Sequence, residues 1–73
     1  MSVVIAKNKK LYMLRINRRW TQEDAAQRLG IPLATYKLIE QGKQAGKAST
    51  WAKIQKVYNI PDADMWELIK ESL

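Results

Sequence analysis

Gly30 separates two short amphipathic segments, and this break determines how the middle of the chain can fold. The segment 21–29 opens on Thr21 with Asp24 three residues later, which is the capping-box pattern of a helix start. Gly30 ends that segment, because glycine adopts the left-handed conformation that closes a helix at little cost. Pro32, a residue suited to the first helical turn, opens the next segment. The pattern predicts two short helices joined by a turn of about three residues, which is the arrangement of a helix-turn-helix unit.

Three further helical segments complete an all-α prediction, because apolar residues recur in them at spacings of three and four. The predicted helices cover about 8–19, 21–29 and 32–42, then run from a cap at Ser49 or Thr50 to Tyr58, and onward from a cap at Asp62. The side chains expected to face the core include Leu11, Leu14, Ala25, Ala26, Leu29, Tyr36, Ile39, Trp51, Ile54 and Tyr58, and the fifth helix carries Met65, Trp66 and Ile69. The small residues at 25 and 26 allow close approach of the third helix. We therefore expect one compact five-helix domain over residues 8–73.

Residues 1–7 form a separate apolar arm in this prediction. Its apolar core is Val3-Val4-Ile5, which fits an arm, a short strand for dimer pairing or an extension packed on the body. The lysines follow this stretch, whereas a signal peptide would place them before it. No apolar run has the length of a membrane-spanning helix, so we expect a soluble cytoplasmic protein with no membrane partner.

The chain has no cysteine and no histidine among its 73 residues. This composition excludes disulfides, thiolate chemistry and zinc sites of the Cys/His type. General acid–base catalysis usually relies on histidine or on a perturbed carboxylate pair in a cleft. We therefore expect that the protein is not an enzyme and that it binds no metal, no cofactor and no small-molecule substrate.

Charge is distributed unevenly along the chain. Residues 1–61 hold twelve basic against three acidic side chains, whereas residues 62–73 hold one basic against four acidic ones. The excess of basic residues in 1–61 favours a polyanion partner, although such an excess can also contribute to solubility alone.

Residues 15–43, RINRRWTQEDAAQRLGIPLATYKLIEQGK, resemble the lambda-repressor/Cro (XRE-type) family of helix-turn-helix regulators. The matching features are Arg15, Thr21-Gln22, Ala26, Leu29-Gly30-Ile31, Ile39-Glu40, Gly42-Lys43, and Trp51 and Ile54 followed by Tyr58-Asn59-Ile60. The resemblance covers about residues 8–70. It implies a lambda-repressor-like DNA-binding fold and a transcriptional regulator of the Cro/repressor type, suited to a phage or mobile-element genetic switch.

Arg15 and Glu40 are charges on otherwise apolar helix faces, and a buried unpaired charge is costly. The resemblance implies that these two residues pair between the first and third helices. It also implies that Gln22 contacts a DNA phosphate. Thr21, the neighbouring residue, is a further candidate for a phosphate contact. The segment 42–47 contains two glycines and is predicted to be a loop. Its Lys43 and Lys47 are candidate phosphate contacts, with a solvated loop as the alternative.

The outer face expected for the third helix is formed by Pro32, Leu33, Ala34, Lys37 and Leu38. In helix-turn-helix units this face enters the major groove. Family members usually present polar side chains there, whereas only Lys37 of this set can donate a hydrogen bond to a base. DNA shape and apolar contacts would then supply much of the specificity.

An apolar face also suits a protein partner, and it motivates an alternative function. In that alternative the chain is an antirepressor or co-regulator that binds and inactivates a partner repressor. A third interpretation places Leu33 in the core. The candidate partners are thus operator double-stranded DNA, a second copy in a homodimer and a partner repressor.

Overall fold

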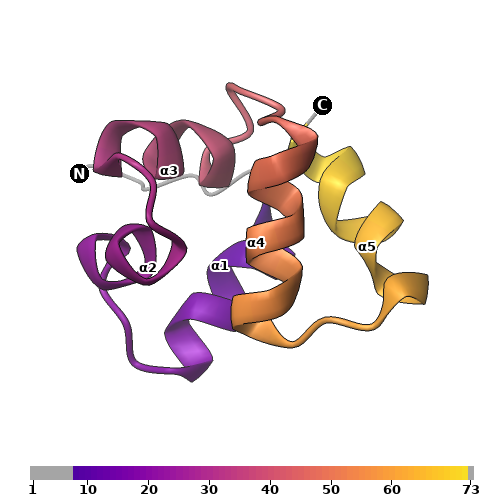
Figure 1. Cartoon of the computed structure of the whole chain (residues 1–73), viewed down its shortest axis with the longest axis horizontal. Helices are drawn as coiled ribbons and strands as arrows, with labels where there is room; N and C mark the ends of the chain where they lie inside the picture. The colour runs from indigo at the N-terminus through magenta and orange to yellow at the C-terminus, as the bar shows by residue number, and fades with distance from the viewer. Residues whose placement is uncertain (1–7, 73) are drawn as a thin grey trace.

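The computed structural model describes residues 8–72, which form five helices and a terminal 3₁₀ turn. The elements are α1 (Lys9–Asn17), α2 (Gln22–Leu29), α3 (Leu33–Glu40), α4 (Ala48–Tyr58), α5 (Asp62–Ile69) and the turn Lys70–Ser72. No strand occurs within residues 8–72, so the predicted all-α five-helix fold is confirmed. In Figure 1, α4 stands in front of α1, with α2 and α3 on one side and α5 on the other. The predicted arm, residues 1–7, lies outside the described residues.

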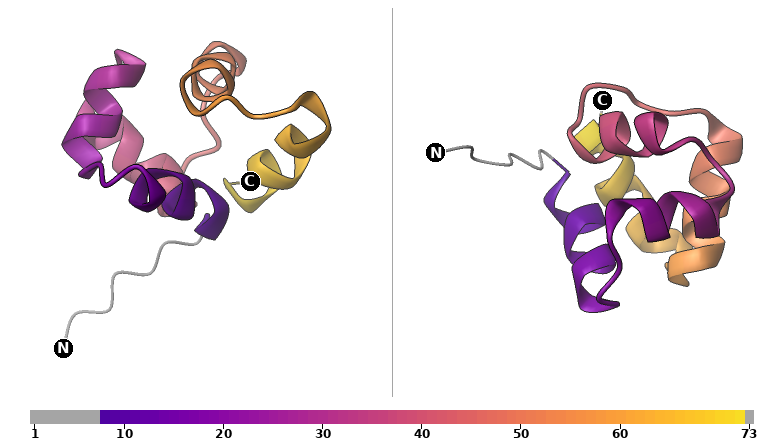
Figure 2. Two further views of the ribbon diagram at one scale, coloured as in Figure 1. Left: turned by 90° about the horizontal axis from the view of Figure 1, so that it is seen from below. Right: turned by 90° about the vertical axis from the view of Figure 1, so that its left-hand side faces the viewer.

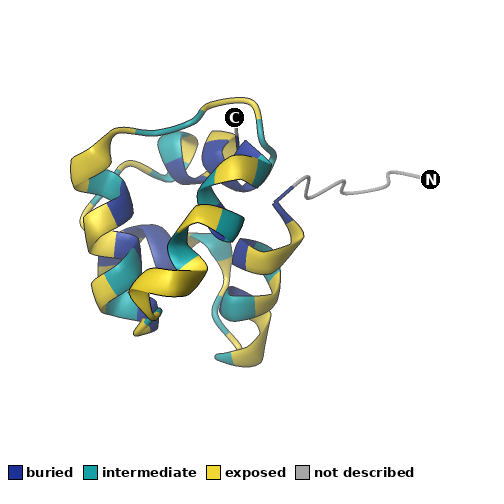
Figure 3. Ribbon diagram, turned by 90° about the vertical axis from the view of Figure 1, so that its right-hand side faces the viewer, coloured by how far each residue is buried: buried dark blue, intermediate teal, exposed yellow. Residues whose placement is uncertain are grey.

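One apolar core joins all five helices. It consists of Leu11, Ala25, Ala26, Leu29, Tyr36, Ile39, Trp51, Ile54, Tyr58 and Leu68. Figure 3 shows that the buried stripes of the helices lie on their inner faces. In α5 the fully buried side chain is Leu68, whereas Trp66 is 60% exposed. Leu68 was not among the residues predicted for this helix, although it lies three residues after Met65, on the same face of α5.

The junction between α2 and α3 follows the predicted signals. The Thr21 hydroxyl accepts the Asp24 backbone N–H at 3.0 Å, and the Asp24 carboxylate accepts the Thr21 N–H at 3.0 Å, which completes the capping box. Gly30 has φ of 69°, and its N–H donates to the Gln27 carbonyl while the Ile31 N–H donates to that of Ala26. This pair of bonds is a Schellman closure, which turns the chain sharply into α3.

Several predicted helix ends are wrong by one or two residues. The first helix ends at Asn17 because Arg19 adopts a positive φ of 58° and closes it. The third ends at Glu40 rather than Gly42.

The predicted caps of the last two helices are also wrong. Lys47, not Ser49 or Thr50, holds the extended cap position of α4, and it makes no side-chain cap bond. Pro61, not Asp62, precedes α5; its fixed φ of −61° and its ψ of 146° place Asp62 as the first helical residue. There the Asp62 carboxylate accepts a hydrogen bond from the Gln55 amide.

A buried polar network closes the domain where its two ends meet. Asn8 is fully buried; its Oδ1 accepts the Leu11 N–H at 3.1 Å and so caps α1. Its Nδ2 donates to the Leu68 carbonyl at 2.9 Å and to Ser72 Oγ at 2.7 Å. Ser72 Oγ in turn donates to the Ile39 carbonyl at 2.8 Å. The network therefore joins the start of α1 and the end of α3 to the C-terminal turn.

A second buried polar contact joins α3 to α4. The Tyr36 and Tyr58 hydroxyls lie 3.0 Å apart. Burial, followed by the hydrogen bond to Tyr58, raises the pKa of Tyr36 far above its ordinary value, and burial also raises the pKa of Tyr58. Both hydroxyls therefore stay protonated near neutral pH, and one donates to the other.

Within residues 8–72, no helix combines the length and the apolar character needed to cross a bilayer.

Candidate nucleic-acid interface

The site begins with the close packing of α2 against α3. Ala25 is fully buried and Ala26 is 3% exposed, so the two helices meet over small side chains. The turn between them comprises Gly30 to Pro32, three residues. Figure 2 shows α2 and α3 adjacent at one side of the domain. Residues 21–40 therefore form the predicted pair of crossed helices.

The outer surface of α3 is mostly apolar, as predicted, but Leu33 contributes less of it than expected. Pro32, Ala34 and Lys37 are exposed. Leu38 is 38% exposed, whereas Leu33 is partly buried and packs against the core. Leu33 therefore lies between the outer-face position and the core position that the sequence left open. Lys37 is the one cation among these five residues.

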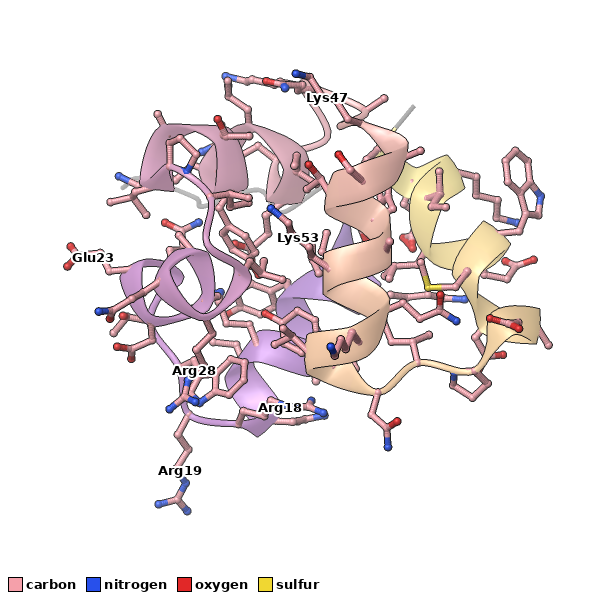
Figure 4. The ribbon with its side chains drawn as sticks, viewed as in Figure 1. Arg18, Arg19, Glu23, Arg28, Lys47 and Lys53 are labelled. Atoms are coloured by element: carbon pink, nitrogen blue, oxygen red, sulfur yellow. The ribbon has the colours of Figure 1, made fainter. Side chains whose placement is uncertain are left out.

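Two lysines extend this surface beyond the end of α3. Lys43 and Lys47 are exposed in the loop between Glu40 and α4. Figure 4 shows Lys47 above that loop. The Lys43 N–H donates to the Leu38 carbonyl at 2.9 Å, so the loop continues directly from the last turn of α3. Ammonium groups placed in this way can contact phosphates that flank a groove-bound helix.

A buried polar cluster beneath the surface joins α1, α2 and α3. Arg15 Nε donates to Glu40 Oε1 at 3.0 Å, with the two side chains 9% and 1% exposed. Arg15 Nη1 donates to the Trp20 carbonyl at 2.9 Å. The other Glu40 oxygen accepts Gln22 Nε2 at 2.9 Å. The structure thus brings Arg15 and Glu40 together and adds Gln22, a contact that the sequence did not reveal.

Thr21 lies at the exposed start of α2, next to Gln22. Its hydroxyl oxygen accepts the Asp24 N–H at 3.0 Å, and the hydroxyl also interacts with the Asp24 carboxylate. The Thr21 backbone N–H first, and its hydroxyl second, hold the pKa of Asp24 below its ordinary value. Glu23 projects from the same turn into solvent (Figure 4). The first turn of α2 therefore combines the Gln22 amide donor with two carboxylates, one of which is engaged in the cap.

An arginine–aromatic cluster that was not predicted from the sequence lies where α1 ends. The Arg28 guanidinium lies 4.5 Å from the centre of the Trp20 ring, and that of Arg18 lies 5.0 Å from the centre of Tyr58. Arg18 also donates to the Tyr58 carbonyl at 2.9 Å. Figure 4 places Arg18, Arg19 and Arg28 together, at the end of the molecule opposite Lys47. The cluster joins the connection between α1 and α2 to α4. In the sequence, only the closeness of Arg18 to Trp20 could have indicated it.

An open groove of about 550 Å³ lies on the α1 side of the domain. It runs between α1 and the turn that joins α4 to α5, and Met13, Leu14 and Leu68 are among its lining side chains. No three acidic, histidine or cysteine side chains within residues 8–72 gather in a way that could hold a metal ion.

Residues 10–68 match the family described as a helix-turn-helix domain. The chain is also similar to the cryptic phage CTXphi transcriptional repressor RstR of Vibrio cholerae, with 36% identity over 56 residues. The matched region covers 77% of this chain and 50% of the repressor, so the chain spans about half the length of that relative. No solved structure matches the chain significantly. These similarities give no support to the antirepressor alternative, and the partial burial of Leu33 reduces the apolar surface that motivated it.

Proposed function

The chain belongs to the helix-turn-helix domain family, and from that premise we propose that it binds double-stranded DNA through α2 and α3 and regulates transcription. The observation that carries the proposal is the position of Lys37, Lys43 and Lys47. All three are exposed, on the outer surface of α3 and on the loop that continues from it. The similarity to a phage transcriptional repressor supports a repressor of the Cro type, from a phage or mobile element. A phage repressor acts on DNA in the cytoplasm of its bacterial host, and we assign the same location to this protein.

In the proposed complex the outer surface of α3 enters the major groove. Lys37 donates to a guanine edge, while Ala34 and Leu38 contact thymine methyl groups. One lysine gives limited direct readout of the bases. Much of the specificity is therefore assigned to sequence-dependent DNA shape.

Phosphate contacts fix the position of the domain on the duplex. At the start of α2, Thr21 and Gln22 contact phosphates of one DNA strand. Beyond the end of α3, Lys43 and Lys47 contact phosphates of the DNA backbone. We further propose that the protein binds as a homodimer to two half-sites about one turn of the DNA helix apart. Each copy would then make the same phosphate contacts at its own half-site.

Removing Lys43 and Lys47 together is expected to weaken binding to any duplex and to reduce its dependence on salt. Each lysine that neutralises a phosphate releases counterions from the DNA. The negative slope of the logarithm of the association constant against the logarithm of the salt concentration should therefore become less steep by about one unit per lysine. The measurement is fluorescence anisotropy of a labelled mixed-sequence duplex, titrated at several salt concentrations with the native protein and with Lys43→Ala/Lys47→Ala.

Lys70→Ala is the matched control, because Lys70 lies in the C-terminal turn and pairs with Glu67 at 2.7 Å. It should leave the slope almost unchanged. If the control lost as much slope per lysine as the double variant, net charge alone would drive binding. A native protein without affinity for the duplex would rule out the proposed function.

A further inference from the structure

We propose that Glu40 is a positioning residue for DNA binding, because it fixes the side-chain amide of Gln22 in the orientation that contacts a phosphate. This inference rests on the proposed function. The contact that motivates it is the bond from Gln22 Nε2 to Glu40 Oε2, at 2.9 Å. Glu40 is 1% exposed, so a buried carboxylate holds the side-chain amide of Gln22, which lies at the edge of the proposed interface.

The chemistry of the carboxylate determines which end of the amide it faces. Glu40 receives a hydrogen bond from the Arg15 guanidinium on one oxygen, and an arginine side chain in a protein does not lose its proton. A carboxylate paired in this way only accepts hydrogen bonds. Gln22 must therefore turn its nitrogen, rather than its oxygen, toward Glu40.

This orientation leaves one N–H of the Gln22 amide available. An amide nitrogen carries two protons, and Glu40 Oε2 accepts one of them. Gln22 is the first residue of α2 and is only partly buried, so the second N–H can donate to a phosphate oxygen at the start of that helix. A donor that is already fixed in the free protein loses less side-chain entropy on binding.

The same contact sets the amide relative to α3. Glu40 is the last residue of that helix, and its backbone carbonyl also accepts the Asn8 N–H at 3.1 Å. Arg15 holds the carboxylate from α1. The phosphate donor on α2 is therefore held in a fixed position relative to the base-contacting surface of α3.

A double-mutant cycle on DNA affinity tests the positioning role. Gln22→Ala in the native background should weaken binding to a mixed-sequence duplex by about 10- to 100-fold, the usual effect of losing a hydrogen bond to a charged group. In the Glu40→Gln background, where a neutral amide can present either end, Gln22→Ala should have almost no further effect. A merely structural Glu40 would give equal losses in the two backgrounds, because the two changes would then be additive.

Hydrogen exchange of side-chain amides gives a second measurement that needs no Glu40 variant. In the free native protein one Gln22 amide proton should exchange more slowly than those of Gln27, an exposed residue of the same helix. The second proton should become protected when the duplex is added. Gln22 protons that exchange as fast as those of Gln27 would overturn the inference.

The two failures can be told apart. Native binding combined with equal effects of Gln22→Ala in both backgrounds overturns the positioning role alone. A native protein that does not bind the duplex overturns the proposed function, and this inference with it.

Discussion

Glu40→Ala is expected to destabilise the fold by about 3–5 kcal/mol, the usual effect of removing one partner of a buried ion pair. The Arg15 side chain is 9% exposed, and its Nε would lose the carboxylate that it contacts at 3.0 Å. Water cannot readily replace that carboxylate, so the guanidinium would remain charged and poorly solvated. A loss of this size is comparable to the whole stability of many domains this small, so the variant should unfold at a markedly lower urea concentration.

Two variants separate a stranded charge from a lost attraction. Arg15→Met/Glu40→Leu removes both charges and should recover much of the stability, because an apolar pair of similar volume requires no solvation. Glu67→Ala removes an exposed carboxylate paired with Lys10 and Lys70, and it should leave the urea midpoint almost unchanged. A Glu40→Ala midpoint as high as that of Glu67→Ala would contradict the assignment of a buried pair.

Asn8→Ala is expected to destabilise the domain by about 2–4 kcal/mol, from the loss of a helix cap together with buried hydrogen bonds. The substitution removes the acceptor of the Leu11 N–H, and it leaves the Leu68 carbonyl and Ser72 Oγ without the amide that donates to them. Urea unfolding followed by circular dichroism measures the change.

Asn8→Asp separates the two contributions, because an aspartate keeps the capping oxygen but cannot donate. It should be clearly less stable than the native protein, since its carboxylate would face the Leu68 carbonyl. Asn17→Ala, at the exposed end of α1, is the matched control and should have little effect. An Asn8→Asp variant as stable as the native protein would show that the amide donor contributes nothing.

The parts of the fold that could be predicted from the sequence are those set by neighbouring residues. Thr21 and Asp24 lie three residues apart, so a cap that joins them is visible in the sequence. Gly30 is recognisable as a helix end because its backbone conformation favours glycine. The buried faces of α2 and α4 follow from the helical period, which is again a short-range property.

The parts that could not be predicted depend on partners distant in the sequence. Asn8 bonds to residues 60 and 64 positions away, and nothing near Asn8 indicates those partners. Gln22 and Glu40 are 18 positions apart, and their contact appears only once α2 and α3 cross. Leu33 has the spacing of an outer-face residue, yet tertiary packing turns it partly into the core. Long-range packing therefore determined which expected interface residues are exposed.

Binding of DNA by the α2–α3 unit and the loop after it can be followed residue by residue. ¹⁵N-labelled protein is titrated with a mixed-sequence duplex, and the backbone amide signals are followed in nuclear magnetic resonance spectra. The largest shifts are expected at Thr21–Asp24, Leu33–Leu38 and Lys43–Lys47. Shifts confined to α5 or to the groove beside α1, with residues 21–47 unaffected, would contradict this mode of binding.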